Sequence, residues 1–125
     1  MMENASWAKQ VVRAISDVAD TAFQQRAWMG AGPEMSSFVE TYSTLYDDNA
    51  FDDFLAQPEW KLTGLNHAVR QEMVLLDQLF QAYQEPESHA EILADPKWQE
   101  VVQQAQQVLR TIGEGPANAE QEENS

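Results

Sequence analysis

Few residues of this sequence have the types and spacing that catalysis requires. The histidines are His67 and His89, and no acid lies three or four residues from His67 to orient it as a base. Glu85 and His89 are four residues apart, but Pro86 lies between them and disfavours a shared helical face. The sequence has no phosphate-binding glycine loop, no Gly-x-Ser-x-Gly motif and no HExxH motif. We therefore predict that the protein is not an enzyme.

One pair of carboxylates has a spacing that could serve metal binding or acid–base chemistry. Asp48 and Asp52 are four residues apart and would share one face of a short helix. A calcium loop beginning at Asp47 would need an oxygen ligand at its fifth position and glycine at its sixth, where the sequence has Phe51 and Asp52. The absence of cysteine excludes disulfides, thiolate metal sites and cysteine nucleophiles. We expect no metal, no cofactor and no small-molecule ligand.

Charge is the strongest signal in the composition. The chain has 21 acids and 7 bases, a net charge of −14. Four of the acids follow Gly113, so residues 1–113 keep 17 acids against 7 bases, a net charge of −10. Most of the acidity therefore belongs to the part of the chain that can fold. Such a field repels nucleic acid and anionic membranes and favours a basic partner, although it also serves solubility.

The acids are concentrated where large rings are also frequent, in EMSSFVETYSTLYDDNAFDDFL, residues 34–55. Residues 27–60 contain seven acids and no Lys or Arg. The apolar residues recur at helical spacing and are expected to anchor short helices to the core, which leaves the acids outside. Exposed aromatic rings beside acids suit a basic protein, because arginine stacks on such rings. The candidate partner-binding residues are Glu34, Glu40, Tyr46, Asp47, Asp48, Asp52, Asp53, Glu59 and Trp60.

Apolar periodicity predicts the helices that must position these residues. A spacing of three and four predicts a first helix over residues 6–28, ended by the Gly/Pro-rich segment 30–33. Ser37 and Glu40 form a capping box that opens a second, short helix. Residues 47–49, Asp-Asp-Asn, offer caps for a third, very short helix around Phe51.

The second half of the chain has the most regular pattern. We predict a fourth helix, capped by Thr63 and running to about Gln84, followed by a short helical turn at residues 89–93. Residues 95–96, Asp-Pro, begin the last helix, because Asp caps it and Pro suits its first position; Gly113 ends it.

These elements predict an all-α fold: a single compact, bundle-like domain of about five helices over residues 1–113. Period-two alternation and hairpin turns are absent. Residues 114–125 contain no large apolar side chain, so we expect a disordered acidic tail. No signal peptide and no apolar run of membrane-spanning length is visible, which favours a cytoplasmic protein.

Residues 30–55, GAGPEMSSFVETYSTLYDDNAFDDFL, place a Gly/Pro loop before a capped helix that ends in an Asp-Asp corner. With its small size, acidity and helical content, the chain resembles the immunity proteins of bacterial contact-dependent growth inhibition and related polymorphic-toxin systems. The resemblance implies a protein that binds a toxin domain tightly and blocks its active site. Such toxins are often nucleases, whose basic clefts accept an acidic inhibitor.

Two other functions fit the same composition. The protein could be an acidic helical adaptor or subunit whose charge serves solubility. It could also mimic nucleic acid and inhibit a DNA-binding protein, which would require carboxylates spaced like phosphates along an elongated surface. The apolar residues between the acids argue against that spacing.

Overall fold

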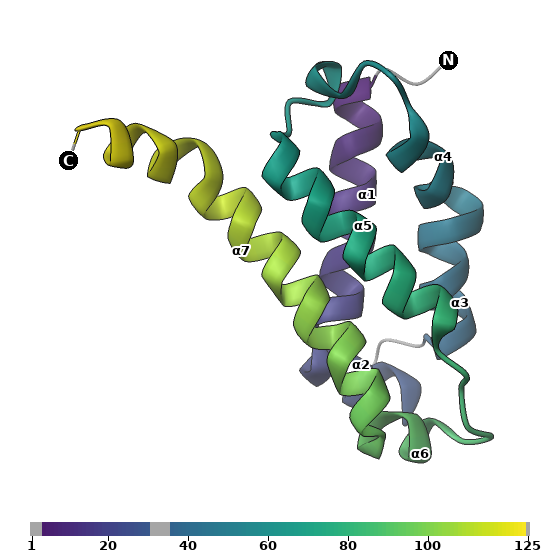
Figure 1. Cartoon of the computed structure of the whole chain (residues 1–125). Helices are drawn as coiled ribbons and strands as arrows, with labels where there is room; N and C mark the ends of the chain where they lie inside the picture. Colours follow the sequence, from purple (N-terminus) through teal and green to yellow (C-terminus); the bar gives the residue numbers. More distant parts are fainter. Residues whose placement is uncertain (1–3, 31–35, 125) are drawn as a thin grey trace.

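The structure, a computed structural model, describes residues 4–30 and 36–124, with side chains up to residue 113. The described residues form one compact all-α domain, as predicted, without strands. Its α-helices are α1 (Asn4–Ala19), α2 (Thr21–Trp28), α3 (Phe38–Ser43), α4 (Phe51–Ala56), α5 (His67–Ala82), α6 (His89–Ala94) and α7 (Pro96–Asn124) (Figure 1). A π-helix, η1 (Thr44–Asp48), continues α3, and a 3-10 helix, η2 (Trp60–Thr63), precedes α5. The described residues contain seven α-helices against the predicted five or so, because the predicted first helix is divided in two and the predicted turn at residues 89–93 forms a helix of its own.

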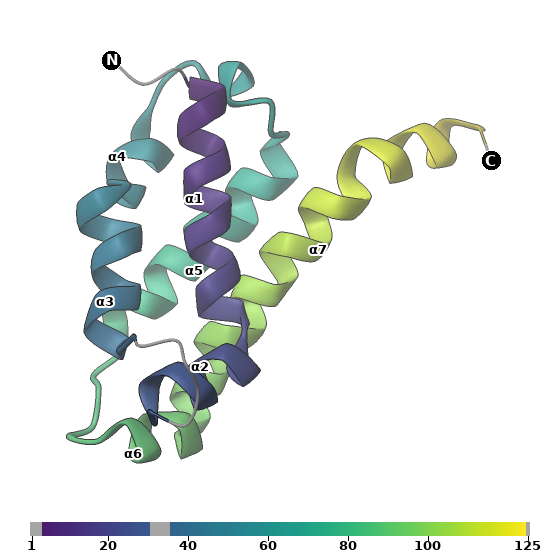
Figure 2. The same ribbon diagram turned by 180° about the vertical axis from the view of Figure 1, so that it is seen from behind.

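Helix α1 has the largest set of neighbours. It packs against α7 on one side and against α3, η1 and α4 on the other, and it also contacts α2 and η2 (Figure 2). The helix with the most regular apolar stripe, α5, packs mainly against α7 and α4. In the described residues, no helix combines the length and apolar content needed to cross a bilayer.

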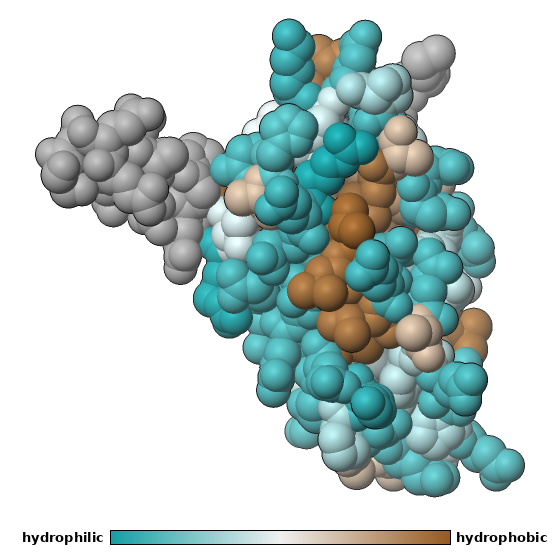
Figure 3. Space-filling model, viewed as in Figure 1, coloured by the Kyte–Doolittle hydropathy of each residue, from teal (hydrophilic) through white to brown (hydrophobic). Residues whose placement is uncertain are grey.

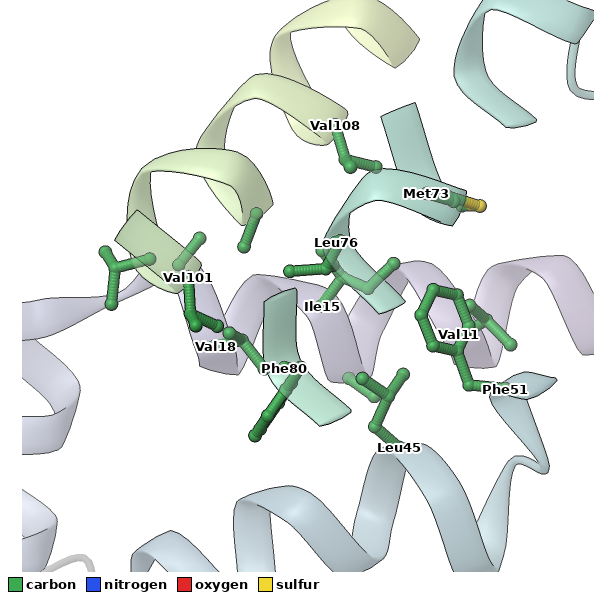
Figure 4. Close-up of a cluster of buried hydrophobic side chains, with 14 of the residues drawn as sticks. Val11, Ile15, Val18, Leu45, Phe51, Met73, Leu76, Phe80, Val101 and Val108 are labelled. Atoms are coloured by element: carbon green, nitrogen blue, oxygen red, sulfur yellow. The ribbon is translucent and has the colours of Figure 1, made fainter. Parts of the chain in front are cut away.

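The core is built from matching apolar stripes. Val11, Ile15 and Val18 of α1 recur at helical spacing and are fully buried. They meet Met73, Leu76 and Phe80 of α5, Leu45 of η1, Phe51 of α4, and Val101 and Val108 of α7 (Figure 4). The buried face of α1 and of α5 therefore coincides with the stripe of apolar residues at helical spacing.

The predicted first helix is divided at Asp20. Its carboxylate accepts the Phe23 N–H at 2.9 Å and caps α2. Gln24 donates from Nε2 to the carbonyls of Asp17 (2.9 Å) and Val18 (2.8 Å), in the last turn of α1. Carbonyls in the last turn of a helix lack helical N–H donors. A buried amide side chain therefore compensates for the break, which periodicity did not reveal.

Two predicted helix starts are confirmed by their caps. The Ser37 hydroxyl accepts the Glu40 N–H at 3.0 Å and opens α3. The Asp95 carboxylate accepts the Lys97 N–H at 3.0 Å at the start of α7. Local side-chain chemistry was sufficient for both predictions.

The predicted cap of α5 is wrong. Thr63 lies in η2, where its hydroxyl donates to the Trp60 carbonyl at 2.7 Å. The cap is Asn66, whose side-chain oxygen accepts the Val69 N–H at 2.9 Å. Gly64, with φ of 80°, ends η2 and separates it from α5. Both Thr and Asn can cap a helix, so composition did not distinguish the two sites.

The predicted stop at Gly113 is also wrong. The helical backbone of α7 continues to Asn124, and this end of the helix projects away from the bundle (Figure 1). A glycine inside a helix costs only about 1 kcal/mol relative to alanine, which does not compel a helix to end.

Leu76→Ala tests the assignment of the buried face of α5. Leu76 is 0% exposed, whereas its neighbour Leu75 is 43% exposed. We expect Leu76→Ala to lower the free energy of unfolding by about 2–5 kcal/mol, and Leu75→Ala to change it by less than about 1 kcal/mol. Urea unfolding of both variants provides the measurement. Equal losses would show that the face is assigned wrongly.

Candidate functional site

Four exposed carboxylates form what we call the acidic corner: Asp47 and Asp48 at the end of η1, and Asp52 and Asp53 in the first turn of α4. None of the four forms an ion pair among the described residues. Where a described ion pair does occur, between Lys97 and Glu100, it lies on α7. The negative charge of the corner is therefore available to a partner.

The acidic corner lies over buried aromatic side chains. Phe51 and Phe54 of α4 are fully buried and Leu55 is nearly so, while the carboxylates of α4 point the other way. The predicted division of residues 34–55 into a core face and an acidic face is thus confirmed for the described residues. Glu40 of α3 is exposed as expected; Glu34 lies outside the described residues.

The turn between the two pairs of acids is fixed by Asn49, which is buried. Its Nδ2 donates to the Thr44 carbonyl at 2.6 Å, and its own carbonyl accepts the indole N–H of Trp7 at 2.6 Å. The next residue, Ala50, adopts the left-handed conformation with φ of 47°. An alanine there costs about 1–2 kcal/mol, so the surrounding contacts must hold it. The corner is thereby tied to α1.

The prediction that residues 47–49 cap the third short helix is wrong. The residue before α4 is Ala50, and no side-chain cap bond forms there. Asp52 and Asp53 instead lie in the first turn of α4, where the partial positive charge of the helix N-terminus stabilises carboxylates modestly.

Tyr46 joins this region to α5. It is half-buried, and its hydroxyl donates to Asp77 Oδ1 at 2.8 Å; Gln81 Nε2 donates to the same oxygen at 2.7 Å. The ring of Tyr46 packs against the ring of Tyr42, with centroids 4.6 Å apart and ring planes tilted by 31°. Burial, and then the hydrogen bond to Asp77, raise the pKa of Tyr46 far above its ordinary value. Tyr46 is therefore a bridging residue whose hydroxyl is already engaged.

Trp60 does not belong to the surface, contrary to the prediction. It is 2% exposed, its ring packs edge-on against Phe54 at 5.1 Å, and its indole N–H donates to the Asn66 carbonyl at 2.9 Å. A tryptophan near a helix end can either be exposed and contact a partner or be buried and cover the end of the core, and Trp60 is buried. The preceding residue, Glu59, is exposed as predicted.

Arg70 is a cation that sequence reasoning overlooked. Its guanidinium carbon lies 5.1 Å from the centroid of the Trp60 ring. Its Nη2 donates to the carbonyls of Leu55 at 2.6 Å and Gln57 at 3.3 Å, at the end of α4. This positive charge is committed to backbone oxygens and does not neutralise the carboxylates of the corner. The sequence around Arg70 does not predict these hydrogen bonds, because their acceptors lie 13 and 15 residues away in the chain.

The histidines do not form a catalytic arrangement with acids. His67 is exposed at the start of α5. His89 is half-buried, accepts the Phe38 N–H at 3.4 Å through Nε2, and packs against Trp28 with ring centroids 5.5 Å apart. Across residues 4–30 and 36–113, no group of three or more His, Asp or Glu side chains converges in a way that could hold a metal ion.

Comparison with known proteins identifies the family. A family model described as a domain of unknown function, DUF7945, matches residues 2–120, so the chain belongs to this family. No curated protein and no solved structure matches the chain. The family description names no activity.

Tyr46→Phe tests the bridge to α5 through its pH dependence. An unfolded tyrosine ionises near pH 10, whereas folded Tyr46 keeps its proton, so the unfolded state binds fewer protons at alkaline pH. The contribution of Tyr46 is complete below about pH 10 and is lost as the pH rises further. We expect Tyr46→Phe to cost about 1 kcal/mol at neutral pH and to flatten the alkaline loss of stability. Urea unfolding across this pH range measures both, and an unchanged alkaline slope would contradict the bridge.

Proposed function

We propose that this protein is an immunity protein that binds and neutralises a cognate toxin domain, a nuclease, through its acidic surface. The observation that carries the proposal is the acidic corner: four exposed carboxylates without ionic partners among the described residues, set on a buried aromatic base. A protein whose charge served solubility alone would not need these acids concentrated on one fixed turn.

Electrostatics explains why such a corner suits a basic partner. Asp47, Asp48, Asp52 and Asp53 lie within seven residues of chain and repel one another, which raises the free energy of the unbound protein. A cationic cleft relieves this repulsion on binding. The long-range field also steers the two proteins together, so that association is fast and falls with salt.

Apolar contacts would supply the remaining affinity. Arg70, Val74, Asp77 and Gln81 recur at helical spacing along the stripe of α5 that faces η1 and α4. Val74 is 36% exposed, and the neighbouring Leu75 is 43% exposed. Figure 3 shows apolar side chains gathered on this face of the molecule among polar ones. An apolar centre within a charged rim is the usual arrangement of a tight protein interface.

The partner in this proposal is a basic protein. The inhibitor covers the cleft in which the toxin would bind nucleic acid, and it needs no cofactor, membrane, nucleic acid or small molecule of its own. It would act in the cytoplasm, where an incoming nuclease meets its substrate.

The double charge reversal Asp52→Lys, Asp53→Lys tests the proposal. The toxin is sought as the protein encoded directly before this chain, and its domain is expressed in cells with each variant. Wild type should restore growth. The double variant should protect less, with an association rate that falls at least about tenfold and depends less on salt.

The matched control is Glu91→Lys, Glu100→Lys, which changes the net charge equally on the exposed surfaces of α6 and α7. It should protect as well as wild type, and thermal melts should show that both double variants remain folded. Full protection by the Asp52/Asp53 variant would show that the toxin binds a different surface. Failure of wild type to protect would contradict the immunity function and favour an adaptor.

A further inference from the structure

A pocket opens between the start of α3 and the end of α5. Its volume is about 340 Å³, and it is lined by Phe38, Val39, Tyr42, Gln81, Tyr83 and Glu85. We call it the aromatic pocket. We propose that it receives an arginine side chain of the basic protein partner and so anchors that partner to the acidic surface. The inference rests on the proposed function for the nature of the partner.

Aromatic rings form the walls. Phe38 is buried and stacks on Tyr42, with ring planes 25° apart and centroids separated by 6.4 Å. The ring centroids of Tyr83 and Phe38 are 5.9 Å apart. The hydroxyl of Tyr83 donates to Asp95 Oδ2 at 2.8 Å, so its polar end is occupied outside the pocket. A planar guanidinium can lie against such rings and gain cation–π attraction.

Three polar groups of the pocket lining can accept hydrogen bonds. Glu85 is exposed and contributes a carboxylate that also acts electrostatically on Tyr83. Gln81 uses its N–H to bond Asp77, which leaves its carbonyl oxygen without a partner among the described residues. The Tyr42 hydroxyl likewise makes no hydrogen bond within the described part of the chain. The five N–H donors of a guanidinium match this surplus of acceptors, and no described Lys or Arg lines the pocket.

The pocket and the acidic corner belong to one surface. The ring of Tyr42, which lines the pocket, packs against the ring of Tyr46, and Tyr46 and Gln81 both donate to Asp77. At the rim, Val39 is 61% exposed and offers apolar area to the carbon stem of an arginine side chain. A partner steered by the corner would therefore meet the pocket in the same encounter.

An NMR titration of the full chain tests the pocket directly. The probe is a blocked glycine–arginine–glycine tripeptide at millimolar concentration, since one side chain binds weakly. Its matched control is the same peptide with citrulline, which has the shape of arginine without the charge. We expect the arginine peptide to shift the amide signals around Tyr42, Gln81 and Glu85, and the citrulline peptide to leave them unchanged.

Two variants locate the binding. Glu85→Gln should weaken the arginine peptide about tenfold, because it removes the charged acceptor. Glu87→Gln removes an exposed acid two residues away, outside the pocket lining, and should bind like wild type. Equal binding of arginine and citrulline, no saturable shifts, or wild-type binding by Glu85→Gln would overturn the proposal. The peptides contain no toxin, so these outcomes are distinct from a failure of growth protection.

Discussion

Trp98 of α7 is fully buried, and its indole N–H donates to the side-chain oxygen of Gln24 at 3.1 Å. Four other rings lie within 5.3–5.7 Å of it: Phe38, Phe80, Tyr83 and Trp28. They come from α3, α5, the segment after α5, and α2. The Nε2 group of Gln24 donates its two N–H bonds to carbonyls in the last turn of α1. The buried side chain of Gln24 therefore joins the end of α1 to α2 and α7 through three hydrogen bonds, and the ring cluster positions α3 and the end of α5 beside them.

The two surfaces proposed to bind a partner are positioned by this cluster. Phe38 fixes the start of α3, and with it the aromatic pocket; Tyr83 forms the opposite wall. Farther along the chain, beyond η1, the hydrogen bond from the indole N–H of Trp7 to the Asn49 carbonyl fixes the turn of the acidic corner. Because both surfaces are held by buried contacts, a partner would meet them preformed, which lowers the entropy lost on binding.

The sequence predicted the features that depend on local chemistry. The all-α class, the caps Ser37 and Asp95, and the exposure of the acids of α4 follow from periodicity and capping preferences. It did not predict the break at Asp20 or the burial of Trp60, because both depend on partners distant in the chain or on competition between similar residues. The same holds for the bond from Tyr46 to Asp77, across 31 residues. The one sequence feature that could have indicated this bond is the position of Asp77 among the apolar residues of α5.

We infer that the bond from Trp98 to Gln24 organises the core, and a double-mutant cycle with Gln24→Leu and Trp98→Phe tests this claim. Gln24→Leu leaves the indole N–H and two carbonyls of α1 buried without partners, which should cost at least about 1–3 kcal/mol. Trp98→Phe removes the donor together with part of the ring packing. The free energies of unfolding, measured with urea, should be coupled by about 0.5–3 kcal/mol, with the double variant less destabilised than the sum of the two single variants. Additive losses, or a Gln24→Leu variant as stable as wild type, would contradict the claim.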